Sequence, residues 1–321
     1  MNVLAVDIGG THYRVALVNQ TGTILSVQRA PVRREAGAAE LLQRLLPQIL
    51  AVSGQAVEPV QAVGIGFGGP VDFRQQRVMR SLHVAGWDGF SFRDWLRPHL
   101  DVPLVVDNDG NVGALGEYRF GAGRGSTDMV YYTVSTGVGG GIVLDGQIRR
   151  GMHSQAGELG HVPLLPSGPL CTCGARGCLE ALCSGPALAR QALDLIEGGS
   201  CTSILTLRFQ EQKTLTARDV FACAHEGDPR AVELLQRARH WFSSAVRAVV
   251  RTIDPDTVVV GGGVGTAPGF LDGIEAAVNE HPLLADAPRV AVKAAALGDD
   301  SVLLGAAAMA MVLHPPLGAQ S

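Results

Sequence analysis

Three cysteines and a histidine lie close together in one short stretch of this chain and restrict how it can fold. Cys171, Cys173 and Cys178 fall within eight residues, and His161 lies ten residues before the first of them. Thiolates and an imidazole are ligands that zinc prefers, and four of them in tetrahedral geometry make a closed structural site. The sequence therefore predicts a structural zinc site here.

Two carboxylates, Glu158 and Glu180, flank this cluster and are poor ligands for a site already filled by softer atoms. If zinc holds the loop, these carboxylates and one face of His161 stay free to bind another ligand. The alternatives are a redox pair or ordinary buried cysteines, but a disulfide framework is expected in short secreted chains, not in a chain of this kind. The remaining cysteines are predicted to be small buried residues: Cys183, Cys201 and Cys223.

The composition narrows the class of protein. The chain has 321 residues, 46% of them hydrophobic, which is enough for two domains with their own cores. No apolar run reaches the length of about 18 residues that a membrane helix needs, and the first residues lack the basic region of a secretory signal. The net charge is −4, without a basic run typical of nucleic-acid binding. We expect a cytoplasmic protein that binds neither membranes nor nucleic acids.

Three glycine-rich turns each follow a short apolar run that is typical of a strand. The runs are 2–8, 129–134 and 257–260, and the turns are 9–11, 135–141 and 261–265. Backbone N–H groups in the first two turns could hold a polyphosphate from both sides, with Asp7 opposite a magnesium ion. Neither turn matches the Walker pattern or the dinucleotide-binding pattern, so a P-loop enzyme and a Rossmann dehydrogenase are disfavoured.

A run of polar residues follows the predicted strand 102–106. It reads Asp107, Asn108, Asp109, Gly110 and Asn111. Ligands usually meet an open α/β sheet at the carboxyl ends of its strands. Capping of the next helix is the alternative interpretation, although capping requires only one such residue. We expect Asp109 to act as a general base toward a substrate hydroxyl, and Asn108 to orient that hydroxyl.

Strand patterns that alternate with helical ones predict an α/β layered fold. The expected strands are 2–8, 14–19, 23–27, 60–67, 102–106, 129–134, 142–144, 257–260 and 288–292. The expected helices are 37–52, 92–100, 112–118, 186–197, 217–225, 229–252, 268–279 and 301–313. The segment 198–214 has no regular pattern.

Six motifs together resemble the ROK family of bacterial sugar kinases, and within it most of all the glucokinases. In chain order they are DIGGTHYR, GFGGPVD, VVDNDGN, STGVGGGIVLDG, GELGH with CTCGARGCLE, and VVVGGGVG. The resemblance covers about residues 3 to 310 and implies the actin-like, ribonuclease-H-type ATPase fold, with two α/β domains around a cleft. We expect a small domain of residues 1–108 plus about 302–321, and a large domain of residues 109–301 that carries the zinc site.

The resemblance also implies ATP-dependent phosphorylation of a hexose, expected to be glucose to glucose 6-phosphate in glycolysis, with Asp109 as the base. The sugar would be held by Asn108, Glu158, His161, Glu180 and Gly69. The nucleotide would be held by Asp7, Gly9, Gly10, Thr11, Thr136, Gly137, Gly139, Gly261, Gly262 and Gly263. The implied cofactors are ATP, Mg²⁺ and a structural Zn²⁺ bound by His161, Cys171, Cys173 and Cys178. The resemblance implies a homodimer or homotetramer.

Two residues depart from the family pattern: Ser135 stands where the second loop often has glycine, and Gly110 where the catalytic loop usually has alanine. A kinase for fructose, mannose, N-acetylmannosamine or N-acetylglucosamine stays open, as does a non-catalytic sugar sensor. A sensor should have lost the base or a phosphate loop, and both are present here. The first strand starts at residue 2, so we expect no DNA-binding domain of the repressor branch. A zinc hydrolase is disfavoured because four protein ligands leave no open position on the metal.

Overall fold

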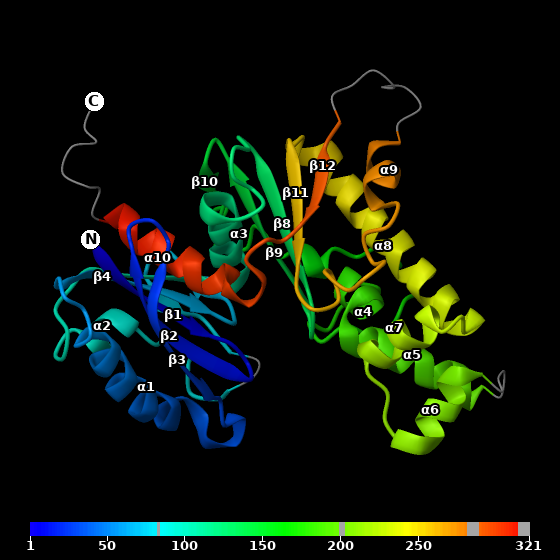
Figure 1. Ribbon diagram of the computed structural model, residues 1–321, viewed down its shortest axis with the longest axis horizontal. Coiled ribbons are helices and arrows are strands. Elements are labelled where there is room, and N and C mark those ends of the chain that lie inside the picture. Colours follow the sequence, from blue (N-terminus) through cyan, green and yellow to red (C-terminus); the bar gives the residue numbers. More distant parts are fainter. Residues whose placement is uncertain (82–83, 199–202, 281–288, 314–321) are drawn as a thin grey trace. The chain divides into compact units, whose positions relative to one another are not determined.

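The computed structural model describes residues 1–81, 84–198, 203–280 and 289–313 (Figure 1). These residues form two compact units. The first unit contains residues 1–125, 141–157 and the chain from Ala296 onward, and the second contains residues 126–140 and 158–295. These bounds differ from the domains expected from the sequence, 1–108 with 302–321 and 109–301, which stay a prediction.

The first unit is built on a five-stranded sheet with the order β3-β2-β1-β4-β7. Its strands are β1 (Asn2–Ile8), β2 (His12–Asn19), β3 (Ile24–Pro31), β4 (Val60–Phe67) and β7 (Leu104–Asn108). The first three strands form the antiparallel meander that the sequence predicts, and β4 lies parallel to both β1 and β7. The carboxyl ends of β1, β4 and β7 therefore lie at one edge of the sheet.

Helices cover both faces of this sheet. Side chains on a strand alternate between its faces, so the successive apolar residues of β1 make both faces apolar. Leu4 and Val6 of β1 pack in one core with α1 (Gly37–Ser53). Val3 of the same strand packs in the other core with α10 (Ser301–Leu313) and α3 (Asp109–Phe120). In Figure 1, α1 and α10 are accordingly seen on either side of the blue strands.

Helix α10 packs at backbone contact distance against its neighbours. An added Cβ at Gly305 would lie 1.7 Å from the carbonyl oxygen of Val112 in α3, and one at Gly64 would lie 1.9 Å from that of Ala306. Only glycine allows such an approach, since any larger side chain would separate the two backbones. This packing joins α3 to the first unit, which is why the observed boundary lies after Gly125 and not before Asp109.

The second sheet has the order β10-β9-β8-β11-β12. Its strands are β8 (Met129–Val134), β9 (Val138–Leu144), β10 (Gln147–Ile148), β11 (Thr257–Gly261) and β12 (Ala291–Ala294), and the division between the units passes through β9. Strand β11 lies parallel to both of its neighbours. The helices of the second unit are α4 (Leu179–Cys183), α5 (Gly185–Glu197), α6 (Ile204–Gln212), α7 (Ala217–His225), α8 (Pro229–Ile253) and α9 (Ile274–Asn279).

The remaining elements are short. They are β5 (Val71–Asp72), β6 (Arg77–Val78), α2 (Phe92–Leu96) and the 3₁₀ turns η1 (Arg34–Ala36), η2 (Leu159–His161) and η3 (Gly298–Asp300). Helix α2 ends four residues before the expected helix 92–100 does. The search of the described residues for a helix that is both long and apolar enough to span a bilayer found none.

Candidate active site and metal centre

Three segments that the sequence assigns to chemistry meet at the carboxyl edge of the first sheet. Gly9 follows β1, Gly68 follows β4, and Asp109 follows β7. The N–H of Gly68 donates to the carbonyl oxygen of Ile8 at 2.8 Å. An added Cβ at Gly68 would lie 3.4 Å from Cα of Gly9 and 3.5 Å from Oδ2 of Asp109. The first glycine turn and the predicted base therefore lie side by side in the first unit.

Asn108 caps helix α3, so the capping alternative is realised at this position. Its Oδ1 accepts from the N–H of Gly110 at 2.9 Å, and its Nδ2 donates to the carbonyl oxygen of Gly69 at 3.1 Å. Asn108 and Gly69, two of the predicted sugar-binding residues, are thus linked by a hydrogen bond. Asp109 is the first residue of α3 and is half-buried, where the helix N-terminus favours a negative charge.

Asp7 lies in an ion pair beside the first glycine turn. Its Oδ2 accepts from Nε and Nη2 of Arg14 at 3.1 and 2.8 Å, and Arg14 also donates to Oδ1 of Asp300 at 2.8 Å. Burial raises the pKa of Asp7, and the Arg14 guanidinium opposes that rise. Arg14 would compete with a magnesium ion for this carboxylate, so the magnesium role of Asp7 stays a prediction.

The second and third glycine turns lie together in the second unit, because β8 and β11 are parallel neighbours. The N–H groups of Val264 and Gly265 donate to the carbonyl oxygen of Val134 at 2.9 and 3.0 Å. Gly262 has a φ of +82°, and an added Cβ there would lie 2.4 Å from that same oxygen. An added Cβ at Gly263 would lie 4.0 Å from Oγ of Ser135, so the third turn lies against the end of β8, where the second turn begins. Gly262 is required by both its backbone angle and its surroundings.

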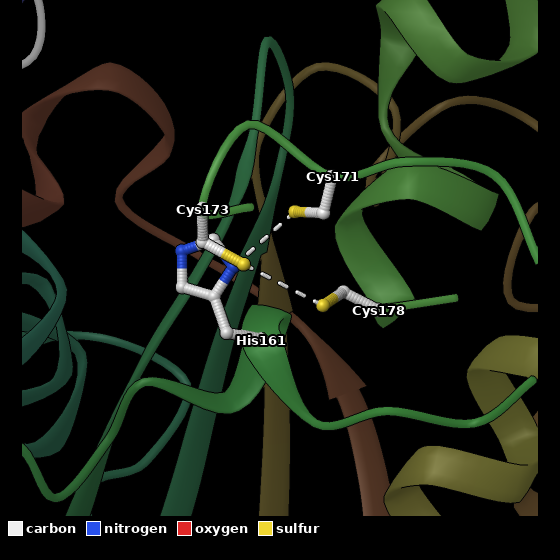
Figure 2. Close-up of side chains that lie close together, drawn as sticks. All are labelled: His161, Cys171, Cys173 and Cys178. Atoms are coloured by element: carbon white, nitrogen blue, oxygen red, sulfur yellow. Dashed lines mark hydrogen bonds between the residues drawn. The ribbon is translucent and has the colours of Figure 1, made fainter. Parts of the chain in front are cut away.

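The four predicted zinc ligands converge (Figure 2). One side-chain donor atom from each of His161, Cys171, Cys173 and Cys178 lies within 4.8 Å of the others. The sulfur atoms of Cys173 and Cys178 are 3.7 Å apart, and Sγ of Cys171 is 3.6 Å from Nδ1 of His161. Tetrahedral zinc bonds of about 2.3 Å to sulfur and about 2.0 Å to nitrogen imply separations of about 3.8 and about 3.5 Å. The donor set therefore fits a closed zinc site.

Glycines shape the loop that carries these cysteines. Gly174 and Gly177 have φ angles of +92° and +66°, and an added Cβ at Gly177 would lie 1.7 Å from the carbonyl oxygen of Leu165. The loop is held by a hydrogen bond from the N–H of Cys171 to the carbonyl oxygen of Ala175 at 2.8 Å. The sulfur atoms can converge because glycine adopts these angles without steric cost.

The predicted sugar residues of the second unit lie around the start of β9. Exposed Glu158 precedes η2, and His161 ends it. An added Cβ at Gly160 would lie 1.9 Å from the carbonyl oxygen of Val138, whose N–H donates to Oε2 of Glu180 at 3.0 Å. The GELGH segment and Glu180 thus both contact the second glycine turn. The predicted residues form two sets, one in each unit, and each set is brought together locally.

Sequence reasoning missed the buried ion pair between Asp107 and Arg150. Asp107 is 1% exposed, and its Oδ2 accepts from Nε of Arg150 at 2.6 Å. Its Oδ1 accepts from the N–H of Asn108 at 2.8 Å and from Nδ2 of Asn111 at 3.2 Å. Burial raises the pKa of Asp107, against the opposing effect of Arg150. The guanidinium carbon lies 3.5 Å from the ring centroid of Phe73. Asp107 thus anchors the segment that carries Asp109.

Glu117 is a second buried carboxylate that the sequence did not reveal. It is 0% exposed and accepts from the N–H groups of Ala122, Ala296 and Leu297, each at 2.9 to 3.0 Å. The hydroxyl of Ser301 also donates to it at 2.7 Å. It therefore connects the end of α3 to the chain that leads into α10. Its partners lie up to 184 residues away, so no local pattern could have indicated this role.

Of two cavities among the described residues, only the smaller one is lined by predicted site residues. One of about 510 Å³ opens between α5, α8 and the loop at Leu165, and none of the predicted residues lines it. A much smaller one of about 10 Å³ is lined by Gly9, Gly10 and Gly68 together with Trp87. Trp87 is 1% exposed and stacks edge-on with Phe67 at 5.1 Å, so this aromatic pair backs the first glycine turn.

The fold is that of the actin-like ATPases, as comparison with known proteins shows. The chain is 31% identical to a ROK family glucokinase from Streptomyces griseus, whose crystal structure is a complex with glucose and AMPPNP. That structure superimposes with a TM-score of 0.81, over 97% of this chain and 100% of the other. The actin-like ATPase fold expected from the sequence is confirmed.

The ROK family model matches residues 3–312. A glucokinase from Halalkalibacterium halodurans is 32% identical over 310 residues, covering 94% of this chain and 92% of that protein. An N-acetylmannosamine kinase from Yersinia pestis is 33% identical over 306 residues, covering 95% of this chain and 96% of that protein. The chain belongs to the ROK family.

Proposed function

We propose that this protein transfers the γ-phosphoryl group of ATP to a hydroxyl of glucose, with Asp109 as the general base. The coarser class, an ATP-dependent hexose kinase, follows from relatives that match the chain over nearly its whole length. Glucose is the proposed substrate because glucokinases are among these relatives, including one solved with glucose and AMPPNP. The observation that carries the role of Asp109 is its place beside Gly68 and Gly9 at the start of α3.

The proposed reaction is an in-line displacement at the γ-phosphorus. The Asp109 carboxylate takes the proton of the hexose hydroxyl while its oxygen forms a bond to phosphorus. The bond from phosphorus to the β–γ bridging oxygen breaks, and ADP leaves with that electron pair. Backbone N–H groups of the glycine turns at 9–11 and 136–139 stabilise the charge on the transferring group. Asn108, Gly69, Glu158, His161 and Glu180 would hold the sugar.

The two metals would have different tasks. Magnesium supplies charge neutralisation on the phosphate oxygens when ATP is bound. Zinc, bound by His161 and the three cysteines, would fix the loop that leads into α4, the helix that carries Glu180, and would take no part in the chemistry. Because four protein donors fill a tetrahedral shell, this site has a structural and not a catalytic role in the proposal.

N-acetylmannosamine is the second candidate substrate. The observation that favours it is the 33% identity to an N-acetylmannosamine kinase, which equals the identity to the glucokinases within a few per cent. The two sugars differ at one ring position and in the acetamido group there. Residues that hold hydroxyls common to both sugars therefore cannot discriminate between them, and the walls of the pocket must do so.

ATP consumption against a panel of hexoses tests the proposal, with zinc content measured on the same preparation. Turnover on glucose well above the others, with one zinc per chain, is the expected result. Faster turnover on N-acetylmannosamine would change the proposed substrate and leave the proposed role of Asp109 unchanged. The absence of turnover on every hexose, with zinc bound, would favour the sensor alternative.

The proposed reaction consumes ATP and the proposed zinc site needs reduced thiols, so we propose a cytoplasmic location for the enzyme. A homodimer or homotetramer stays a prediction.

A further inference from the structure

One carboxylate connects the metal-binding loop to the glycine turn between β8 and β9. Oε1 of Glu180 accepts a hydrogen bond from the hydroxyl of Thr172 at 2.8 Å, and Oε2 accepts one from the N–H of Val138 at 3.0 Å. Thr172 stands between Cys171 and Cys173 in the loop, and Val138 is the first residue of β9. Glu180 thus bridges the two segments through both of its oxygen atoms.

Two groups face Oε1 of Glu180: the hydroxyl of Thr172 at 2.8 Å and Sγ of Cys171 at 3.7 Å. A thiol is only a weak donor, so the hydroxyl is the principal donor to Oε1. Its hydrogen bond to a carboxylate is of the charge-assisted and stronger kind.

Glu180 can approach the glycine turn because Gly137 has no side chain. An added Cβ at Gly137 would lie 2.7 Å from Oε2 of Glu180. Oε2 therefore lies directly against the turn, next to the N–H of Val138 that it accepts from. A change in the position of Glu180 should alter the protection of that N–H group, and this can be measured without any substrate.

We propose that Thr172 is a positioning residue for Glu180 and, through Glu180, for the turn at Gly137 and Val138. In the proposal, the hydroxyl fixes the rotamer in which Glu180 bridges the two segments. Hexose affinity then depends on a side chain that is not one of the metal ligands. This kinetic consequence rests on the proposed role of Glu180 in sugar binding, whereas the effect on the Val138 amide does not.

The test uses three single variants of the full-length, zinc-loaded protein. T172V removes the hydroxyl and keeps the shape of the side chain, and T172S keeps the hydroxyl. The matched control is T252V, since Thr252 is also an exposed threonine of the second unit whose hydroxyl is hydrogen-bonded, to the carbonyl oxygen of Ala248 at 2.8 Å. Because Thr172 is exposed, its replacement should leave the fold and the zinc content intact.

Two quantities are measured: hydrogen exchange at the Val138 amide without substrate, and KM for the hexose. In T172V, both should rise about five- to tenfold. A hydrogen bond to a charged group is worth about 10-fold or more in an equilibrium, and water replaces part of it at an exposed site. T172S and T252V should behave as the wild type, with zinc unchanged in every variant.

Several results would overturn the proposal. Unchanged exchange at Val138 in T172V would show that the hydroxyl does not hold Glu180, and unchanged hexose KM would show that sugar binding does not depend on it. Loss of zinc from T172V would assign Thr172 to the metal loop alone. A wild type that turns over no hexose would refute the proposed function, and the exchange measurement would still decide the positioning role.

Discussion

The ion pair between Asp107 and Arg150 allows a quantitative prediction. Asp107→Asn removes the charge that Arg150 contacts at 2.6 Å, while the new side chain still offers an oxygen to the N–H of Asn108. Removing one partner of a buried pair costs about 3–5 kcal/mol, because the other charge stays buried and unpaired. The side chain of Arg150 is 21% exposed, so water recovers part of that cost. We expect D107N to lower the free energy of unfolding by about 2–4 kcal/mol.

Urea denaturation followed by circular dichroism measures this loss, provided that the slope m stays unchanged. The matched control is D145N, which breaks the exposed pair of Arg149 and Asp145, with side chains 49% and 82% exposed. An exposed pair is worth well under about 1 kcal/mol. The double variant D107N/R150Q removes both charges and should recover part of the stability lost in D107N. A D107N protein as stable as D145N would refute the anchoring role of Asp107.

Two further predictions concern the second unit. Cys173→Ser should release zinc and lower thermal stability, because a structural zinc site contributes directly to folding; metal analysis that still finds one zinc per chain would contradict the ligand set. At the start of α8, burial raises the pKa of Asp228, but hydrogen bonds from the N–H groups of Leu205, Ala231 and Arg230 outweigh it and lower the pKa overall. Its stabilising effect is therefore complete above the unfolded-state pKa of about 3.9 and is lost as the pH falls through the native pKa. D228N should weaken the acid dependence of the melting temperature, and an identical pH profile would contradict this.

The sequence predicted elements with a regular pattern well and irregular ones poorly. Strands 60–67 and 129–134 and helix 301–313 have the predicted bounds, because their apolar residues form continuous runs. The helix expected at 268–279 begins only at Ile274, since Gly269 and Gly273 have φ angles of +81° and +74° that no α-helix accommodates. The helix α6 was not expected, because its segment has no regular apolar pattern; the side chain of Ser203 caps it by accepting from the N–H of Thr206.

The cysteines show a similar division between local and distant information. Cys183 and Cys223 are fully buried, which confirms the prediction, and Cys201 lies outside the described residues. The zinc donor set was readable because its spacing is local. Asp107 and Arg150 are 43 residues apart, so no local pattern indicated their ion pair. The polar run at 107–111 was therefore interpreted as functional without recognition that Asp107 is a buried structural residue. Only the structure distinguishes the role of Asp107 from the proposed role of Asp109, which lies two residues later.

The most direct test of the proposed function compares kcat and glucose affinity in the wild type and in Asp109→Asn. General base catalysis is typically worth about 10²–10⁴-fold, so kcat should fall by that factor. Glucose binding measured by calorimetry should change little, because the substitution keeps the size and the hydrogen-bonding reach of the side chain. The proposed function predicts that the D109N enzyme binds glucose and scarcely turns it over. A D109N enzyme with near-normal kcat would contradict the assignment of Asp109 as the base.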